Sequence, residues 1–308
     1  MSAEFTPAAH SVGVVGSGAV GQAVATALVA ARFCEQLIIV SRTMEQATSM
    51  AADLDDMCLA LGSPTRPQAA TTAGLQDCQV VVVAVRARFA NANDTDIRMG
   101  GVTVNGQIII ELALALRGLA GVVVMVTNPV DLMSRLFVEV SGIRRVVGIG
   151  SNLDSARYRL ILARMFDVPA CVVRGSVIGE HGDTLVICAS STTVNGEAVH
   201  VPVDRVRAAL LIRSRQISCG IGRTRSGPAG AVLSTLRLLL GLVDGVEELC
   251  SPYRYGWLGL PVSFTSGHAS VRLPQLDHEE TRYLKVSEAK LHAAYFSLTE
   301  QLQLSNQI

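Results

Sequence analysis

The segment Val12-Gly13-Val14-Val15-Gly16-Ser17-Gly18-Ala19-Val20-Gly21 leads from an apolar, β-branched run into a G-x-G-x-x-G pattern, and an alanine-rich stretch follows. This order predicts a strand, a tight turn and a helix. Gly16 would form the turn, Gly18 would let the backbone approach a pyrophosphate, and Gly21 would let the helix pack closely on the strand. The helix N-terminus would offer free N–H groups to the phosphates. The alternative, a glycine turn in an ordinary α/β core, is disfavoured by this context. The candidate cofactor-binding residues are Gly16, Ser17, Gly18, Ala19, Val20 and Gly21.

Apolar runs alternate with helix-like segments through the first half of the chain. The predicted strands are residues 12–15, 37–40, 80–85, 107–110 and 122–126, and the predicted helices are 19–31 and 44–61. Because nearly every position in these strands is apolar, both faces of the sheet should be covered, as in parallel sheets. The pattern therefore predicts an α/β fold with a Rossmann-type doubly wound parallel sheet.

The second half has a different order of elements. Gly148-Ile149-Gly150 would form a hinge before a polar helix. The predicted strands are 171–178, 184–191, 194–201, 262–265 and 269–273, and the predicted helices are 154–166, a long one from residue 228 and a final one at 279–302. With 308 residues and about 150 residues per domain, we expect a dinucleotide-binding domain at 1–150 and an α+β substrate domain at 151–308.

The composition excludes several classes of protein. The 26 basic residues balance the 26 acidic ones, which argues against nucleic acid or an anionic membrane as a partner. Seven single cysteines without a C-x-x-C pair fit reduced thiols in a cytoplasmic protein and neither a disulfide framework nor a metal site. The first ten residues lack the pattern of a signal peptide. Apolar runs are shorter than the roughly 18 residues that span a membrane.

The expected ribose-binding acid is missing. Twenty residues after Gly21, where an NAD site normally has Asp or Glu, the chain has Ser41 and Arg42. Ser41 would hydrogen-bond a 2′-phosphate, and Arg42 would pair with it or stack on the adenine. NADP(H) is therefore favoured, with NAD(H) second. The alternative is that Arg42 simply points to water.

Polar residues gather in three later segments. They are Thr127-Asn128-Pro129-Val130-Asp131, Gly150-Ser151-Asn152-Leu153-Asp154-Ser155-Ala156-Arg157 and Gly179-Glu180-His181-Gly182-Asp183. Together with the glycine loop and Trp257-Leu258-Gly259-Leu260-Pro261-Val262, they resemble the L-lactate/malate dehydrogenase family, in the family's order and over almost the whole chain. The resemblance implies an NAD(P)-dependent oxidoreductase that interconverts 2-oxo and L-2-hydroxy acids, normally as a homodimer or homotetramer.

The resemblance also implies roles for these residues. His181 would give the proton, since a histidine titrates near neutrality. Asp154 would hold the other ring nitrogen, and Arg157 would clamp the substrate carboxylate. Asn128 would donate to the substrate oxygen and help seat the nicotinamide. Without His181 and Asn128, a plain helical ion pair would be the better interpretation of Asp154 and Arg157.

The loop that follows the predicted strand at residues 80–85 departs from the family's sequence pattern. Where the family usually has T-A-G, this chain has Ala84-Val85-Arg86, and Arg86 would either bind a phosphate or block ordinary nicotinamide placement. The family's loop arginine is best matched by Arg98, which would polarise the keto group; a solvated loop arginine is the alternative. Ala84 remains a candidate cofactor contact.

Substrate specificity is expected from the same loop. It is longer than in typical lactate or malate enzymes, and resembles L-2-hydroxyisocaproate dehydrogenases. Phe89 falls at the position that selects the substrate side chain, and Arg88 stands one residue from it. A bulky or apolar 2-oxo acid is the first expectation, and oxaloacetate is the second. Thr224 and Ser226 are alternative candidates for a residue lining the pocket.

A hypothesis from another class is a dinucleotide-binding sensor or partner protein that has lost catalysis. Arg86 and the altered loop support it. The presence of His181, Asp154, Arg157 and Asn128 argues against it, because a sensor would not need all four.

Overall fold

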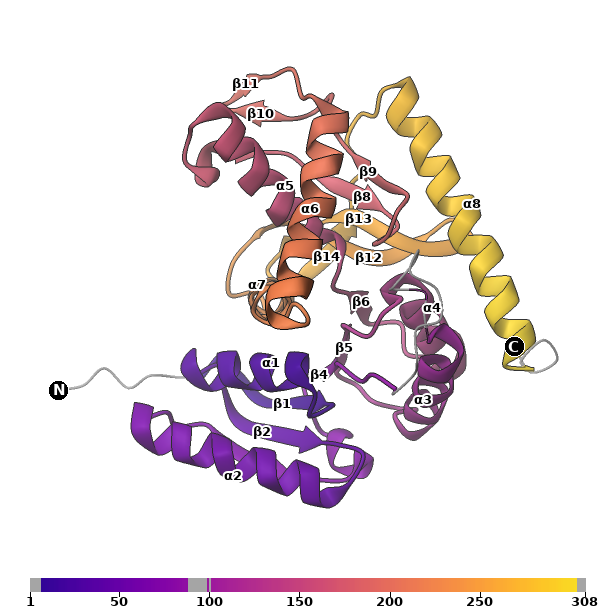
Figure 1. Ribbon diagram of the computed structural model, residues 1–308. Coiled ribbons are helices and arrows are strands. Elements are labelled where there is room, and N and C mark those ends of the chain that lie inside the picture. The colour runs from indigo at the N-terminus through magenta and orange to yellow at the C-terminus, as the bar shows by residue number, and fades with distance from the viewer. Residues whose placement is uncertain (1–6, 88–98, 100, 304–308) are drawn as a thin grey trace.

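The computed structural model describes residues 7–87, 99 and 101–303 (Figure 1). The first half contains β1 (Ala9–Val15), α1 (Ala19–Ala30), β2 (Cys34–Val40), α2 (Met44–Leu61), β3 (Arg66–Ala69), η1 (Thr72–Leu75), β4 (Val80–Val83), α3 (Val102–Ala115), β5 (Val122–Met125), α4 (Val130–Ser141) and β6 (Val146–Gly148). The second half contains α5 (Ser151–Phe166), η2 (Ala170–Val172), β7 (Val173–Arg174), β8 (Val177–Gly179), β9 (Leu185–Ile187), β10 (Thr193–Val194), β11 (Glu197–Ala198), α6 (Val203–Ile221), α7 (Ser226–Leu239), β12 (Gly245–Tyr253), β13 (Gly256–Thr265), β14 (His268–Val271) and α8 (His278–Gln301).

One sheet links the two halves. Within the described residues it has eleven strands in the order β3-β2-β1-β4-β5-β6-β12-β13-β8-β9, with β14 paired to β13. The strands from β3 to β6 pair in parallel, and the others pair antiparallel. This is the predicted Rossmann-type doubly wound sheet, followed by a mixed α and β part. A smaller sheet, β11-β10-β7, lies apart from it.

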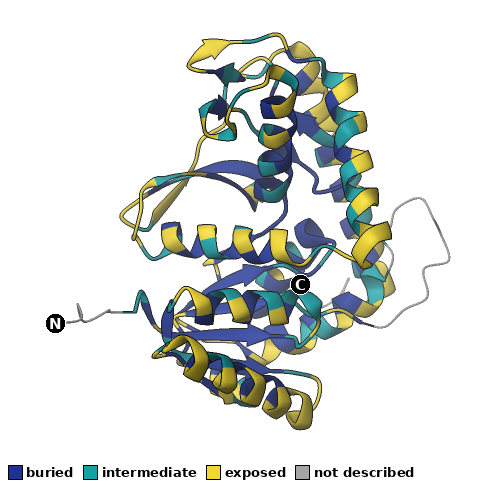
Figure 2. Cartoon of the chain, turned by 60° about the vertical axis from the view of Figure 1, so that its left-hand side comes forward, coloured by how far each residue is buried: buried dark blue, intermediate teal, exposed yellow. Residues whose placement is uncertain are grey.

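Helices cover both faces of the parallel strands, as the apolar runs predict. Successive residues of β4 point to opposite sides: Val80 and Val82 pack in a cluster with α1, α2 and α7, whereas Val81 and Val83 pack with α3, α4 and α8. Figure 2 shows the strands as a buried layer and the helices exposed along their outer faces. The carboxyl ends of β1, β4 and β5 thus meet at one edge, where ligands of such sheets bind.

The predicted strand at residues 107–110 is wrong, because this segment lies within α3. Its buried residues, Asn105, Gly106, Ile109, Leu112 and Ala113, recur at helical spacing. A short run of isoleucines dominated the local pattern and hid the longer period of about 3.6 residues.

Other predicted elements in the second half differ in extent. Residues 171–178 do not form one strand: η2, β7 and β8 divide them, and Gly175 packs so closely on Tyr158 that a Cβ atom would lie 2.6 Å from the ring. The predicted turn at Asn195-Gly196 joins the short strands β10 and β11. The sequence prediction missed α6 and β12 as elements. Among the described residues, none of the helices is both long and apolar enough to cross a membrane.

The long helix α8 begins with a capping box. The Asp277 carboxylate accepts from the Glu280 N–H at 2.8 Å, and the Glu280 carboxylate accepts from the Asp277 N–H at 3.0 Å. We predict that Asp277→Ala lowers the free energy of unfolding by about 1 kcal/mol, measured by urea denaturation. Asp56→Ala, at an exposed position of α2, is the control and should change it by less than about 0.5 kcal/mol. Equal losses in both variants would contradict the capping role.

Candidate active site

The glycine loop lies against the end of β4. Gly16 has φ +112°, and a Cβ atom there would lie 2.6 Å from the carbonyl oxygen of Ala84. A Cβ on Gly21 would overlap the Gly16 carbonyl oxygen, whereas one on Gly18 would meet nothing within 4 Å. Gly18 is also the N-cap of α1, without a side-chain cap. Bare backbone at a helix N-terminus is what a pyrophosphate requires, so these residues fit a dinucleotide.

The end of β2 comes close to the same loop. The Ser41 and Ser17 hydroxyl groups are 2.5 Å apart, and Ser41 Oγ donates to Gln46 Oε1 at 3.0 Å. Arg42 is exposed. The structure therefore brings Ser41 beside the glycine loop, where the predicted ribose-binding position would be.

A buried histidine, carboxylate and arginine form the second part of the site. His181 Nδ1 lies 2.5 Å from Asp154 Oδ2, and Arg157 Nη1 lies 3.5 Å from Asp154 Oδ1. All three side chains are less than a tenth exposed. Asp154 and Arg157 come from α5, whereas His181 follows β8. The carboxylate fixes the ring nitrogen that faces it and stabilises a positively charged imidazole.

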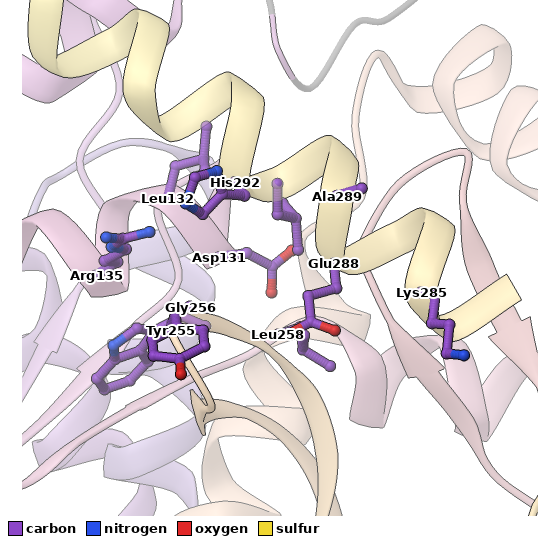
Figure 3. Close-up of a pocket in the computed structure, with 12 residues that line it drawn as sticks. Asp131, Leu132, Arg135, Tyr255, Gly256, Leu258, Lys285, Glu288, Ala289 and His292 are labelled. Carbon is purple, nitrogen blue, oxygen red and sulfur yellow. The ribbon is translucent and has the colours of Figure 1, made fainter. Parts of the chain in front are cut away.

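The backbone around His181 is fixed from several sides. Its N–H donates to Asp131 Oδ2 at 2.9 Å, and a Cβ atom on Gly150 would lie 2.6 Å from its ring. Burial raises the pKa of Asp131 to about 7, although the hydrogen bond from His181 opposes this shift. Asp131 belongs to the sequence motif at residues 127–131, but no role was predicted for it. Its acidic side chain (Figure 3) stands beside the apolar positions of an amphipathic helix, and this pattern could have indicated a role.

Glu180, next to His181, is also buried and held in place. Its carboxylate is 2.8 Å from Lys290 Nζ and accepts from the Thr184 N–H at 3.0 Å. The Glu180 N–H donates to Ser287 Oγ at 2.6 Å. Lys290 and Ser287 lie on α8, so this final helix supports the histidine turn. The sequence prediction gave Lys290 no role, because its partner is 110 residues away.

Asn128 lies at the end of β5, near the loop after β4. Its backbone oxygen accepts from Asn105 Nδ2 at 2.9 Å, and Asn105 Oδ1 accepts from the Ala87 N–H at 2.8 Å. Asn128 Oδ1 is buried and has no hydrogen-bond partner among the described residues. Such an orphaned polar atom is expected where a bound group would complete its hydrogen bonding.

The other predicted residues are less closely joined to this centre. Thr224 lies in the connection between α6 and α7, near α5, because a Cβ on Gly227 would lie 3.1 Å from Leu153 and 3.5 Å from Thr224 Oγ1. Ser226 is exposed at the start of α7. Arg86 is exposed as a residue, and partial burial of its charged group together with repulsion from Arg223 lowers its pKa. The predicted residues outside the described part of the chain are Arg88, Phe89 and Arg98.

Comparisons with known proteins agree with this arrangement. Residues 10–149 match the family model of the lactate/malate dehydrogenase NAD binding domain. An L-lactate dehydrogenase of Deinococcus radiodurans is 32% identical over 303 residues, which cover 91% of this chain and 96% of that protein. The chain belongs to the lactate/malate dehydrogenase family. An L-lactate dehydrogenase of Staphylococcus epidermidis is 27% identical over 306 residues, 92% of this chain and 96% of that protein. The crystal structure of Cryptosporidium parvum malate dehydrogenase has the same fold, with a TM-score of 0.86, 22% identity, and coverage of 95% of this chain and 99% of that one.

We predict that Lys290→Met destabilises the protein, because it leaves the buried Glu180 carboxylate without its cation. The free energy of unfolding should fall by about 2 kcal/mol, measured by urea denaturation. Lys285→Met is the matched control, because the chain's only other lysine lies exposed on the same helix. A loss in the control as large as in Lys290→Met would contradict this role for the ion pair.

Proposed function

We propose that this member of the family interconverts a 2-oxo acid and an L-2-hydroxy acid by hydride transfer with a nicotinamide dinucleotide. The observation that carries the proposal is the buried contact of 2.5 Å between His181 and Asp154, with Arg157 one turn further along the same helix. A purely dinucleotide-binding protein would have no use for this costly burial of ionisable groups.

Each residue has a step in the proposed reaction. Arg157 binds the substrate carboxylate and thereby orients the keto carbon. His181 donates a proton to the keto oxygen, and Asp154 keeps the imidazole oriented and stabilises its charged form. Asn128 hydrogen-bonds the substrate oxygen. The cofactor, when bound, supplies the hydride. Gly16, Gly18 and the N-terminus of α1 would hold its phosphates, and Ala84 lies against Gly16. Arg98 is proposed to polarise the carbonyl.

The direct test is a panel of 2-oxo acids assayed with NADPH and NADH, with variants at the histidine. Because general acid catalysis contributes about 10²–10⁴-fold, His181→Asn should lower kcat by that factor. Cofactor affinity, measured by calorimetry, should stay unchanged. His200→Asn, at an exposed position, is the control. Full turnover of His181→Asn would exclude it as the proton donor. Cofactor binding without reduction of any acid would favour the sensor hypothesis.

For the substrate, we propose a bulky or apolar 2-oxo acid, with oxaloacetate as the alternative. The longer loop and Phe89 support the first, and the neighbouring Arg88 supports the second. The panel separates them by the ratio of kcat/KM values for an apolar acid and for oxaloacetate. The domain boundary at residue 150, the cytoplasmic location and the homodimer or homotetramer stay predictions.

For the cofactor, we propose NADP(H) before NAD(H). Ser41 beside Ser17, the neighbouring Arg42 and the absence of an acidic residue at these two positions support a 2′-phosphate. We predict that Arg42→Ala lowers kcat/KM for NADPH about tenfold, the effect of one charge-assisted contact, and leaves that for NADH unchanged. Arg66→Ala, exposed on β3, is the control. A higher kcat/KM for NADH in the unmodified protein would reverse this proposal.

A further inference from the structure

Three polar side chains form a hydrogen-bonded chain at the predicted ribose position of the dinucleotide site. Ser17 belongs to the glycine loop, Ser41 follows β2, and Gln46 lies in the first turn of α2. The Ser17 and Ser41 hydroxyl oxygens are 2.5 Å apart, and Ser41 Oγ donates to Gln46 Oε1 at 3.0 Å. No role was predicted for Gln46 from the sequence. Its contact with Ser41 places it beside the groups expected to meet the cofactor.

Side-chain hydrogen bonds hold both ends of this chain in place. At one end, the Gln46 N–H donates to the hydroxyl group of Thr43, the N-cap of α2, at 3.2 Å. At the other end, Gln22 Nε2 donates to the Ser17 carbonyl oxygen at 2.8 Å. Ser41 therefore stands between two neighbours with fixed backbones. Its hydroxyl group adjusts to a ligand mainly by redirecting its single proton.

Both serine protons are used within this arrangement. A carbonyl oxygen accepts hydrogen bonds and cannot donate, so the contact with Gln46 Oε1 uses the Ser41 proton. The contact between the two hydroxyl groups then uses the Ser17 proton. The pair is left with lone pairs to offer a ligand. A ribose 2′-hydroxyl group can donate to such acceptors, whereas a 2′-phosphate carries negative charge on acceptor oxygens and needs donors.

Rotation of the Gln46 amide would reverse this preference. The terminal torsion of a glutamine has a broad, roughly two-fold profile, and Gln46 is exposed, so a half-turn can exchange Oε1 and Nε2. Nε2 would then donate to Ser41 Oγ, and the Ser41 proton would become available to a phosphate oxygen. A hydrogen bond to a charged acceptor is about twice as strong as one between neutral groups. A 2′-phosphate would therefore favour the rotated amide.

We propose that Gln46 is a specificity-determining residue of the cofactor site. In one orientation its amide adapts Ser41 to a 2′-hydroxyl group, and in the other it adapts Ser41 to a 2′-phosphate. The inference rests on the proposed binding of a nicotinamide dinucleotide. It gives the site a way to bind both cofactors without an acidic residue at positions 41 and 42. The first turn of α2 then sets the ratio of the two affinities.

Two substitutions of similar side-chain length should shift this ratio in opposite directions. Gln46→Met removes the acceptor, so the Ser41 proton is free to meet a phosphate. Gln46→Glu removes the donor and keeps an acceptor, so that proton stays directed away. We measure the Kd values for NAD⁺ and NADP⁺ by calorimetry without substrate. The ratio of Kd for NAD⁺ to Kd for NADP⁺ should rise about threefold in Gln46→Met and fall at least about tenfold in Gln46→Glu.

The neutral variant separates the hydrogen bond from simple charge, because the negative charge of Gln46→Glu alone would also weaken NADP⁺ binding. A double-mutant cycle shows whether the effect passes through the serine. In a Ser41→Ala background, Gln46→Met should leave the ratio unchanged, because no Ser41 proton remains to be redirected. Gln68→Met, at an exposed glutamine of β3, is the matched control and should also leave it unchanged.

The outcomes distinguish this inference from the proposed function. An unchanged or lower ratio in Gln46→Met, or the same rise in the Ser41→Ala background, would overturn the role of Gln46 alone. If the unmodified protein bound neither dinucleotide, the proposed function and this role would both be wrong. If it bound both but reduced no 2-oxo acid, the proposed reaction would be wrong, and the ratio of Kd values would still decide the role of Gln46.

Discussion

Three buried carboxyl groups contact or belong to the turn that carries His181, and residues from both halves of the structure hold them. Asp154 faces the imidazole, Asp131 accepts the backbone N–H, and Glu180 precedes the histidine in the chain. Isolated carboxylates at such depth would be strongly unfavourable. Each therefore needs a specific donor, and the donors come from helices and turns that are far apart in sequence.

The topology brings these donors together. Asp131 lies in the first turn of α4 and Asp154 in that of α5. These two helices follow β5 and β6, which are neighbours in the sheet. The sheet then continues through β12 and β13 to β8, after which His181 stands. The histidine turn thus returns to the edge from which both carboxylates project. Close packing at Gly150 and Gly259 is part of this geometry, because a Cβ on Gly259 would overlap the Ser151 side chain.

Local motifs made part of this site predictable. The glycine loop could be predicted because its residues are consecutive in the sequence. Asp154 and Arg157 could be placed on one face of a helix because three positions separate them. The contact between His181 and Asp154 could be expected only through the resemblance to a family, because 27 residues separate them. The strand β12 escaped prediction because Glu247 and Glu248 interrupt its apolar pattern. Both are buried: the Ser234 and Thr235 hydroxyl groups donate to Glu247, and the Ser176 hydroxyl group donates to Glu248 Oε1, while Arg159 Nη1 lies 3.8 Å from Glu248 Oε2. Such compensation lies outside any local sequence pattern.

The use of lysine at residue 290 has a geometrical reason of its own. The chain has 26 cations, of which all but Lys285 and Lys290 are arginine, yet a lysine pairs with the buried Glu180. Glu180 Oε2 already accepts from the Thr184 N–H and hydroxyl group, so much of the carboxylate edge is occupied. A planar guanidinium needs two parallel acceptor positions to use its fork, whereas an ammonium is a compact charge with three rotatable donors. Lys290 Nζ reaches both oxygens, at 2.8 and 3.0 Å, within the remaining space. The ion pair therefore depends on the shape of the cation as well as on its charge.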